Sequence, residues 1–147
     1  MDEIVDSPST WVAEHIRNYV RTGGAEGSRL FDNDVLLITT RGRITGKLRR
    51  TPVMYGCDGD NYIVVASYRG MPSHPCWYLN LVANPEVILQ VGPHIFAAKA
   101  RTVTEDEREP RWAMMASRFP TFVTYQEQTT RRFPVISLEP AIVRRTG

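Results

Sequence analysis

The sequence predicts an α+β fold dominated by a small antiparallel β-barrel. About six apolar, β-branched segments follow one another at the short spacing typical of strands joined by hairpins. Segments with helix start and stop signals precede, interrupt and follow them. The chain has 147 residues, of which 42% are hydrophobic and 23% charged, a size and composition that suit one globular core. We therefore expect a single domain covering residues 1–147.

The first 30 residues are expected to form a helix and a glycine-rich connection. Ser7 can cap the helix, Pro8 suits its first turn, and Gly23 or Gly24 suits its end. Five apolar side chains fall roughly on one face of this helix: Trp11, Val12, Ile16, Tyr19 and Val20. We expect this face to pack on the core. A helix that covers a ligand cleft or touches a membrane surface is the alternative.

The strands are expected where the apolar segments lie between turn signals. Asp58-Gly59 is a hairpin signature, and Gly92-Pro93 marks another turn. A glycine turn, "RGRITG", follows the first apolar run. The expected strands cover residues 35–40, 47–56, 62–68, 86–92, 94–103 and 133–140.

Three more helices are expected around these strands. A short one covers about 75–84, because Pro75 suits its start and an Asn-Pro pair its end. Thr104 and Glu107 form a capping box before a longer helix. Since Pro110 lies inside that segment, we expect a kink or two consecutive helical pieces there. Residues 121–133 are the last helix candidate.

Composition argues against several classes of function. The net charge of +2 is too small for a general nucleic-acid or membrane binder. Cys57 and Cys76 give neither a disulfide framework nor a metal-binding spacing, and His15, His74 and His94 lack partners for a metal site or a catalytic triad. The acidic N-terminus does not read as a signal peptide, and no segment is apolar enough to span a membrane. We expect a cytoplasmic protein without a metal.

A basic cluster follows the first expected strand, in "RGRITGKLRR". It contains Arg41, Arg43, Lys47, Arg49 and Arg50 within ten residues. Glycines let the backbone turn tightly and expose its N–H groups, and arginine can bind a phosphate or carboxylate through two hydrogen bonds. The segment therefore predicts an anion site at a strand end. A solvated hairpin with charged tips is the alternative that the residues alone leave open.

A second informative segment is "VVASYRGMPSHPCWYLNL", residues 64–81. A strand ends there, and a glycine-containing loop leads into a helix start, where anions are attracted. Trp77 and Tyr78 offer a flat aromatic surface beside that start. The combination suits a planar, phosphorylated cofactor. Core packing of Trp77, Tyr78 and Leu81 is the alternative.

Two long segments, "LLITTRGRITGKLRRTPVMYGCDGDNYIVVAS" and "HPCWYLNLVANPEVILQVG", resemble the deazaflavin-dependent nitroreductase family of actinobacteria. The resemblance runs from about Tyr19 to Pro140 and rests on the patterns TTxGRxTGxxRRTP and HPxWYLNLxANPxV. It implies a split antiparallel β-barrel related to the FMN-binding oxidoreductases. It also implies an enzyme that binds coenzyme F420 and transfers hydride from the reduced deazaflavin to a small organic acceptor, such as a quinone, an activated alkene or a nitroaromatic compound.

The resemblance further implies which residues bind the coenzyme. The basic turn and the strand after it would hold the phosphate and the anionic oligoglutamate tail, through Arg43, Ile44, Thr45, Arg49, Arg50, Thr51, Pro52, Val53 and Met54. The second segment would line the deazaflavin and its ribityl chain, through Val65, Ala66, Ser67, Tyr68, Cys76, Trp77, Tyr78, Leu79 and Asn80. The family's "ASKGGAPKHP" reads "ASYRGMPSHP" here, so Tyr68 and Ser73 replace lysines while Arg69 adds a charge.

The resemblance places the acceptor beside Met54, Phe119, Phe122 and Tyr125, at positions where relatives carry tyrosines. Only Tyr125 keeps a phenol, so a flat, weakly polar acceptor is favoured. Ser67 is expected near the reactive ring, and Tyr125 and Ser67 are the candidate proton donors or orienting groups, with solvent as the alternative. Without the resemblance, the helical spacing of Phe119, Phe122 and Tyr125 would indicate an aromatic core stripe.

Three other functions stay open at this stage. They are an FMN-dependent split-barrel oxidoreductase, a non-catalytic F420-binding carrier, and a small barrel used for protein association. A homodimer formed through the barrel face and peripheral membrane contact through the N-terminal helix are also open.

Overall fold

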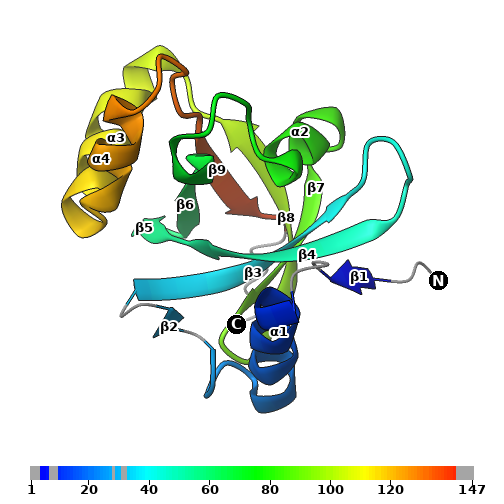
Figure 1. The fold of residues 1–147 in the computed structure, drawn as a ribbon. Coiled ribbons are helices and arrows are strands. Elements are labelled where there is room, and N and C mark those ends of the chain that lie inside the picture. The colour runs from blue at the N-terminus through cyan, green and yellow to red at the C-terminus, as the bar shows by residue number, and fades with distance from the viewer. Residues whose placement is uncertain (1–3, 7–9, 28, 31–32, 142–147) are drawn as a thin grey trace, which may run out of the picture.

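The structure, a computed structural model, describes residues 4–6, 10–27, 29–30 and 33–141 (Figure 1). The helices are α1 (Thr10–Thr22), α2 (Cys76–Ala83), α3 (Glu105–Arg118) and α4 (Thr121–Glu127), with a 3-10 turn, η1, at Tyr68–Gly70. The strands are β1 (Ile4–Asp6), β2 (Arg29–Leu30), β3 (Asn33–Arg41), β4 (Leu48–Met54), β5 (Gly56–Asp58), β6 (Asn61–Val65), β7 (Glu86–Val91), β8 (His94–Thr102) and β9 (Val135–Pro140). Among the described helices, none is long and apolar enough to cross a bilayer.

The sheet curls into a barrel whose two ends are not paired with each other. Its strands neighbour one another in the order β1-β4-β3-β7-β8-β9-β6-β5, and β2 pairs with β3 outside this path. The path from β4 to β5 is antiparallel throughout, whereas β1 runs parallel to β4. Only Tyr55 separates β4 from β5 in the chain, so the two ends of the path meet and form a barrel (Figure 1). The expected split antiparallel barrel is confirmed.

Successive apolar side chains of a strand point alternately into and out of the barrel, and both faces of the barrel wall are buried. On β3, Leu36 and Ile38 lie in the cluster that fills the barrel, while Val35 and Leu37 pack outward against α1. On β6, Val64 belongs to the interior cluster. The outward residues of β6 and β9 pack against α3 and α4, in a cluster of Ile63, Val65, Met115, Phe119, Phe122, Phe133 and Val135. The helices therefore cover the outside of the wall from two sides (Figure 1).

The N-terminal helix packs on the barrel through part of the face predicted for it. Ile16 and Tyr19 are fully buried, but Trp11 is 48% and Val20 39% exposed, so the expected apolar face is wrong at these two positions. Gly23 and Gly24 end the helix with positive φ values, as predicted. The expected capping residues, 7 and 8, lie outside the described residues.

Helices α2 and α3 start where the sequence predicts. Pro75 precedes α2, Asn84 follows it, and the Thr104–Glu107 capping box is present at α3. The expected split at Pro110 is wrong, because α3 continues without interruption from Glu105 to Arg118. Pro110 lies in the second turn, where it removes one backbone hydrogen bond, and the capping box holds the turn before it.

Three further expectations need correction. The candidate helix over 121–133 ends at Glu127, because the chain turns back to bury Phe133 in the core. The strand expected over 62–68 ends at Val65, since Tyr68 and Arg69 adopt positive φ values that a strand cannot contain. The short strands β1 and β2 were not predicted, and neither has the alternating apolar pattern that would reveal it.

One phenol joins α1 to the barrel. The Tyr19 hydroxyl lies 3.2 Å from the carbonyl oxygens of Val35 and Gln90, to either of which it can donate, and it accepts a 2.8 Å hydrogen bond from the Gly92 N–H. Burial raises the pKa of the Tyr19 phenol above its usual range. A single buried oxygen thus connects the helix with β3 and with the turn between β7 and β8.

The Tyr19→Phe variant should lose about 1–3 kcal/mol in free energy of unfolding, because the half-buried Gly92 N–H loses its acceptor and the buried hydroxyl is removed. Chemical denaturation measures the change. The matched control is Tyr62→Phe, which removes the same atom from a ring packed against Tyr55 and Phe96. Equal losses in the two variants would contradict the role assigned to the Tyr19 hydroxyl.

Candidate functional site

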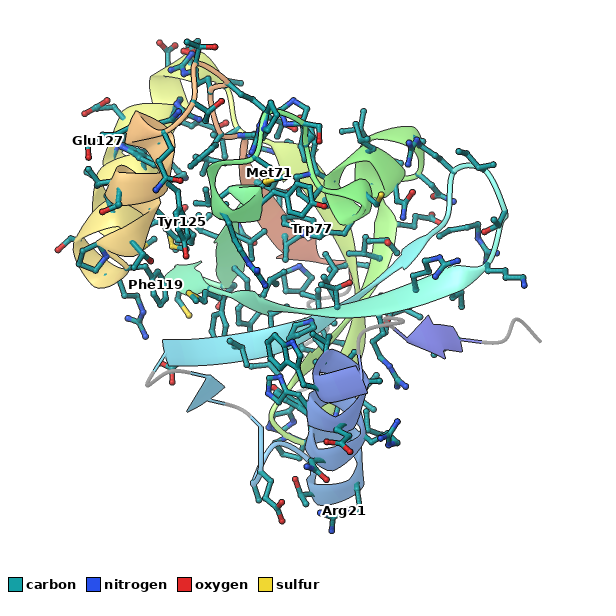
Figure 2. The ribbon with its side chains drawn as sticks, viewed as in Figure 1. Arg21, Met71, Trp77, Phe119, Tyr125 and Glu127 are labelled. Atoms are coloured by element: carbon teal, nitrogen blue, oxygen red, sulfur yellow. The ribbon has the colours of Figure 1, made fainter. Side chains whose placement is uncertain are left out.

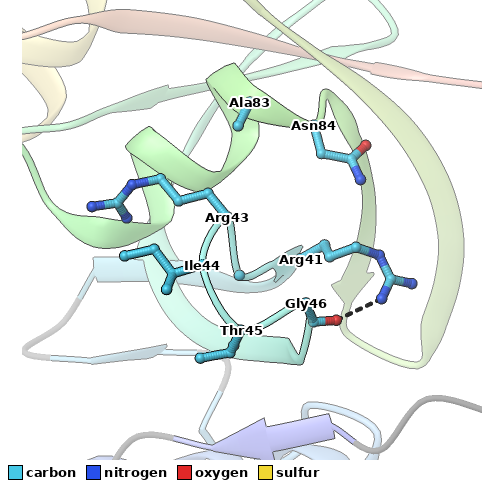
Figure 3. Close-up of a pocket in the computed structure, with 8 residues that line it drawn as sticks. Arg41, Arg43, Ile44, Thr45, Gly46, Ala83 and Asn84 are labelled. Carbon is cyan, nitrogen blue, oxygen red and sulfur yellow. Dashed lines mark hydrogen bonds between the residues drawn. The ribbon is translucent and has the colours of Figure 1, made fainter.

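The basic turn between β3 and β4 is held together by its own backbone. The Gly42 N–H donates to the Lys47 carbonyl at 2.7 Å, and the Gly46 N–H donates to the Gly42 carbonyl at 2.8 Å. Gly46 has a φ of +74°, which favours glycine. The Arg41 guanidinium donates to the Gly46 carbonyl at 2.6 Å (Figure 3). The turn is therefore a defined structure and not a loose hairpin tip.

A buried amide attaches this turn to α2. Asn80 is 4% exposed, and its Oδ1 accepts hydrogen bonds from the Arg43 N–H at 3.0 Å and from the Arg43 Nη1 at 3.5 Å. Its Nδ2 donates to the Thr40 hydroxyl at 3.3 Å. Because a buried amide is costly unless it is paired, these contacts fix the turn against the helix.

An open hollow of about 420 Å³ lies between the turn and the end of α2 (Figure 3). It is lined by Arg41, Gly42, Arg43, Ile44, Thr45, Gly46, Ala83 and Asn84. None of the described residues that line it is acidic. Ile44 is 84% exposed, so the rim faces solvent. Guanidinium groups and a threonine hydroxyl are a donor set that fits a phosphate or carboxylate.

Strand β4 divides the residues predicted to bind the coenzyme between two sides of the sheet. Arg49 lies opposite Thr40 in the β3–β4 register, and opposed residues share a face, so Arg49 lies on the side of Asn80 and α2. Arg50 takes the other side, where it lines a hollow of about 410 Å³ with residues of α1. By the same alternation, Thr51 and Val53 go with Arg49 and Pro52 goes with Arg50, whereas Met54, at the end of the strand, packs against both the α1 cluster and the α3–α4 cluster.

The segment between β6 and α2 forms a loop with an unusual backbone. Ala66 is buried and Ser67 half-buried. Tyr68 and Arg69 follow with φ values of 45° and 53°, both in the left-handed region that non-glycine residues rarely adopt. Gly70 continues it at +76°, and a Cβ there would lie 2.6 Å from the Tyr125 carbonyl oxygen. The loop therefore packs directly on α4.

Helix α2 presents the aromatic residues predicted to line the ring. Trp77 and Tyr78 are half-buried and pack against the interior cluster, so core packing accounts for part of each side chain. The Tyr78 hydroxyl lies 3.2 Å from the Thr102 hydroxyl. Cys76 is exposed at the helix start, and Leu79 is half-buried.

The residues predicted to contact the acceptor gather in one cluster. Phe119 and Phe122 are buried and meet edge to face with ring centroids 5.6 Å apart. Met54 and Tyr125 pack against the same cluster and are half-buried. Figure 2 shows Phe119 and Tyr125 on the side of the α3–α4 region that faces the barrel. Phe119 and Phe122 thus form the buried base of this cluster, and Met54 and Tyr125 form the part of it that solvent can reach.

The three histidines lie in different parts of the structure. The described residues contain no group of three His, Cys, Asp or Glu side chains that could hold a metal ion. The His15 Nε2 lies 2.6 Å from the Gly27 carbonyl, and His94 is exposed. His74 lies in the loop before α2, where its Nδ1 is 2.9 Å from the Arg131 guanidinium. Arg131 contacts this loop repeatedly, yet no local sequence pattern pointed to it.

Known proteins resemble this chain over most of its length. Residues 11–140 match a family model described as F420H2-dependent quinone reductase. An F420H2-dependent quinone reductase of Mycobacterium tuberculosis is 38% identical over 108 residues, which are 70% of this chain and 71% of that protein. A solved F420-H2 dependent reductase, 38% identical, has a TM-score of 0.66 over 71% of this chain and 93% of that chain. Another solved structure, described as a domain-swapped dimer, is 36% identical and has a TM-score of 0.69 over 90% of this chain and 100% of that chain.

Replacing Asn80 with leucine, which keeps the volume and removes the amide, should lower the free energy of unfolding by about 1–3 kcal/mol. Amide exchange should also accelerate in the turn of residues 42–47, because the Arg43 N–H loses its acceptor. Asn84→Leu is the control at the end of the same helix, where the described residues give the side chain no hydrogen bond. Similar exchange in both variants would refute the proposed attachment.

Proposed function

The chain belongs to the F420H2-dependent quinone reductase family, and on this basis we propose that it reduces a quinone-type acceptor with the coenzyme F420H2 at the surface formed by the basic turn, α2 and the 66–74 loop. The observation that carries the proposed site is the donor-rich turn fixed to α2 by Asn80. An anionic appendage and a planar ring need such a pair of neighbouring features, one charged and one aromatic.

The turn is proposed to bind the phosphate and the acidic tail of the coenzyme. Arg43 and Thr45 line the hollow, and Arg49 follows on the same side of β4. Arg43 is exposed and Arg49 half-buried, so a single ion pair with either contributes at most about 1 kcal/mol. Several such contacts together, made to a tail with several negative charges, give a specific and salt-sensitive attachment.

The ring is proposed to lie beside Trp77, with the backbone of Val65, Ala66 and Ser67 along its edge. Trp77 packs against the barrel core, which fixes its indole and leaves part of it accessible. The other residues predicted to line the ring lie in η1 and α2: Tyr68, Cys76, Tyr78 and Leu79. A rigid aromatic residue on a rigid helix holds a flat ligand at little entropic cost.

The bound coenzyme supplies a hydride, and a quinone that takes up this hydride together with one proton becomes a quinol. The protein's own contribution is to position donor and acceptor and to exclude water between them. Met54 and Tyr125, supported by Phe119 and Phe122, provide a largely apolar wall that suits a flat acceptor. The Tyr125 phenol and the Ser67 hydroxyl are the groups proposed to deliver or orient the proton.

Other features of the chain stay predictions. The relative described as a domain-swapped dimer supports a homodimer for this chain as well. A cytoplasmic location and peripheral membrane contact through α1 rest on the sequence alone. The exposed side chains of Trp11 and Val20 are the part of α1 that such a contact would use.

The direct test of the function is anaerobic mixing of the purified protein with F420H2 and a soluble quinone, followed by the absorbance of the coenzyme. We expect stoichiometric oxidation of F420H2 with formation of quinol. Micromolar binding of FMN without binding of F420 would instead support an FMN-dependent enzyme. Bound F420H2 that persists in the presence of quinones, dyes and nitroaromatic compounds would indicate a carrier protein.

The two neighbouring arginines of β4 give a matched test of the site. Arg49→Ala, like Arg43→Ala, should weaken F420 binding about fivefold, because a charge on the α2 side of the sheet is lost. Arg50→Ala removes the same charge from the other side and should change the affinity by less than about twofold. Fluorescence titration at low salt measures all three. A larger loss for Arg50→Ala than for Arg49→Ala would place the coenzyme on the opposite side.

A further inference from the structure

We propose that Arg131 is a positioning residue, which holds the loop of residues 66–74 in the one conformation that presents Ser67 to the coenzyme and acceptor. The inference rests on the proposed function of that loop. Arg131 follows α4 in the chain, 64 positions away from Ser67. Its guanidinium contacts the loop at both ends and in the middle.

The guanidinium group uses four of its five N–H donors on this loop. Nη2 donates to the Ser67 carbonyl at 2.6 Å, and Nη1 donates to the Ala66 carbonyl at 3.1 Å. Nε donates to the Met71 carbonyl at 2.9 Å, and Nη1 also lies 2.9 Å from Nδ1 of His74. A planar fork with fixed donor directions can satisfy all four acceptors at once, which a lysine ammonium group cannot do.

Arg131 is itself held in place by α4 and the segment that follows it. Its carbonyl accepts a 2.7 Å hydrogen bond from the Gln126 side chain, and its N–H donates to the Thr129 hydroxyl at 3.1 Å. The guanidinium carbon lies 4.8 Å from the centroid of the Phe133 ring, which is fully buried. Among the described residues, no carboxylate forms a salt bridge with Arg131. The guanidinium group of Arg131 is therefore bonded to carbonyl oxygens of the loop, and these bonds fix the loop backbone.

The loop needs such a restraint because its backbone is not relaxed. Tyr68, Arg69 and Gly70 all have positive φ values, and two of the three carry a Cβ atom. Conformations of this kind persist where the surrounding structure holds them, and they concentrate at functional sites. The contact of Gly70 with the Tyr125 carbonyl holds the middle of the loop, and Arg131 holds the residues on either side.

Arg131 acts through Ser67 and not on the reacting atoms. Both carbonyls that precede the left-handed residues are hydrogen-bonded by the guanidinium, so losing it frees the backbone on which the Ser67 hydroxyl depends. Small displacements of a positioned group reduce the rate far more than they reduce stability. Apart from Ala66, the residues of the interior cluster lie outside this loop, so the barrel core does not depend on these bonds.

The same contact makes the loop sensitive to acid. Arginine only donates, so His74 Nδ1 must accept, which requires a neutral imidazole with its proton on Nε2. Burial, and then the charge of Arg131, lower the pKa of His74 below its usual range. The other titratable group against the ring is Tyr78, with centroids 5.0 Å apart. The contribution of this bond is complete above about pH 6.5 and is lost as the pH falls from there through the lowered pKa.

The test compares Arg131→Ala and Arg131→Lys with Arg132→Ala, which removes the adjacent arginine, paired with Glu105 on the surface. Arg131→Ala should reduce kcat/KM for quinone reduction about 100-fold. It should also accelerate amide exchange in residues 66–74 without affecting the barrel strands. The lysine variant should restore only part of the loss, and Arg132→Ala should leave both measurements unchanged.

The outcomes separate this inference from the proposed function. Unchanged kcat/KM in Arg131→Ala, or faster exchange without a change in kcat/KM, would overturn the positioning role. A wild-type protein that does not oxidise F420H2 contradicts the proposed function, and the exchange of residues 66–74 then decides whether Arg131 holds the loop. If Arg131→Ala does not fold, His74→Gln takes its place. Glutamine keeps a neutral acceptor, so the loss of activity below about pH 6.5 should disappear. If His74→Gln loses activity on acidification as the wild type does, the proposal is overturned.

Discussion

The buried amide of Asn80 is the contact on which the arrangement of the candidate site depends. It joins the basic turn, the end of β3 and helix α2 through hydrogen bonds at both ends of the amide, and its burial shields them from solvent. The charged turn is thereby kept at a fixed place relative to the aromatic surface of α2. A ligand with an anionic end and a planar end would need both at a constant separation.

Two kinds of hydrogen bond organise the two sides of α2. Asn80 holds the turn on one side by pairing with a backbone N–H, and Arg131 holds the 66–74 loop on the other by pairing with backbone carbonyls. Both are side chains that fix a main chain belonging to a distant segment. The barrel supplies the rigid base, since its inner and outer faces are filled by separate apolar clusters. The site is thus assembled from loops on a curled sheet.

Local patterns predicted most of the barrel, and they failed where long-range contacts decide. Alternation, turn glycines and the Thr104–Glu107 capping box depend on neighbouring residues, so most of the barrel strands and the starts of α2 and α3 were predicted, whereas β1 and β2 were not. The strand register decides on which side of the sheet Arg49 and Arg50 lie. The prediction that both bind the coenzyme did not take this register into account. Arg131 has no local signal, because its partners lie about 60 positions away.

The central claim is that the turn of residues 41–46 binds the anionic appendage of a redox ring placed beside Trp77. The most direct measurement compares the affinity for intact F420 with that for its deazaflavin lacking the phosphate and glutamate tail, at low and high salt. The account predicts that the intact coenzyme binds on the order of 100-fold more tightly at low salt and that the difference shrinks as salt is added. Equal affinities for the two compounds at low salt would contradict it.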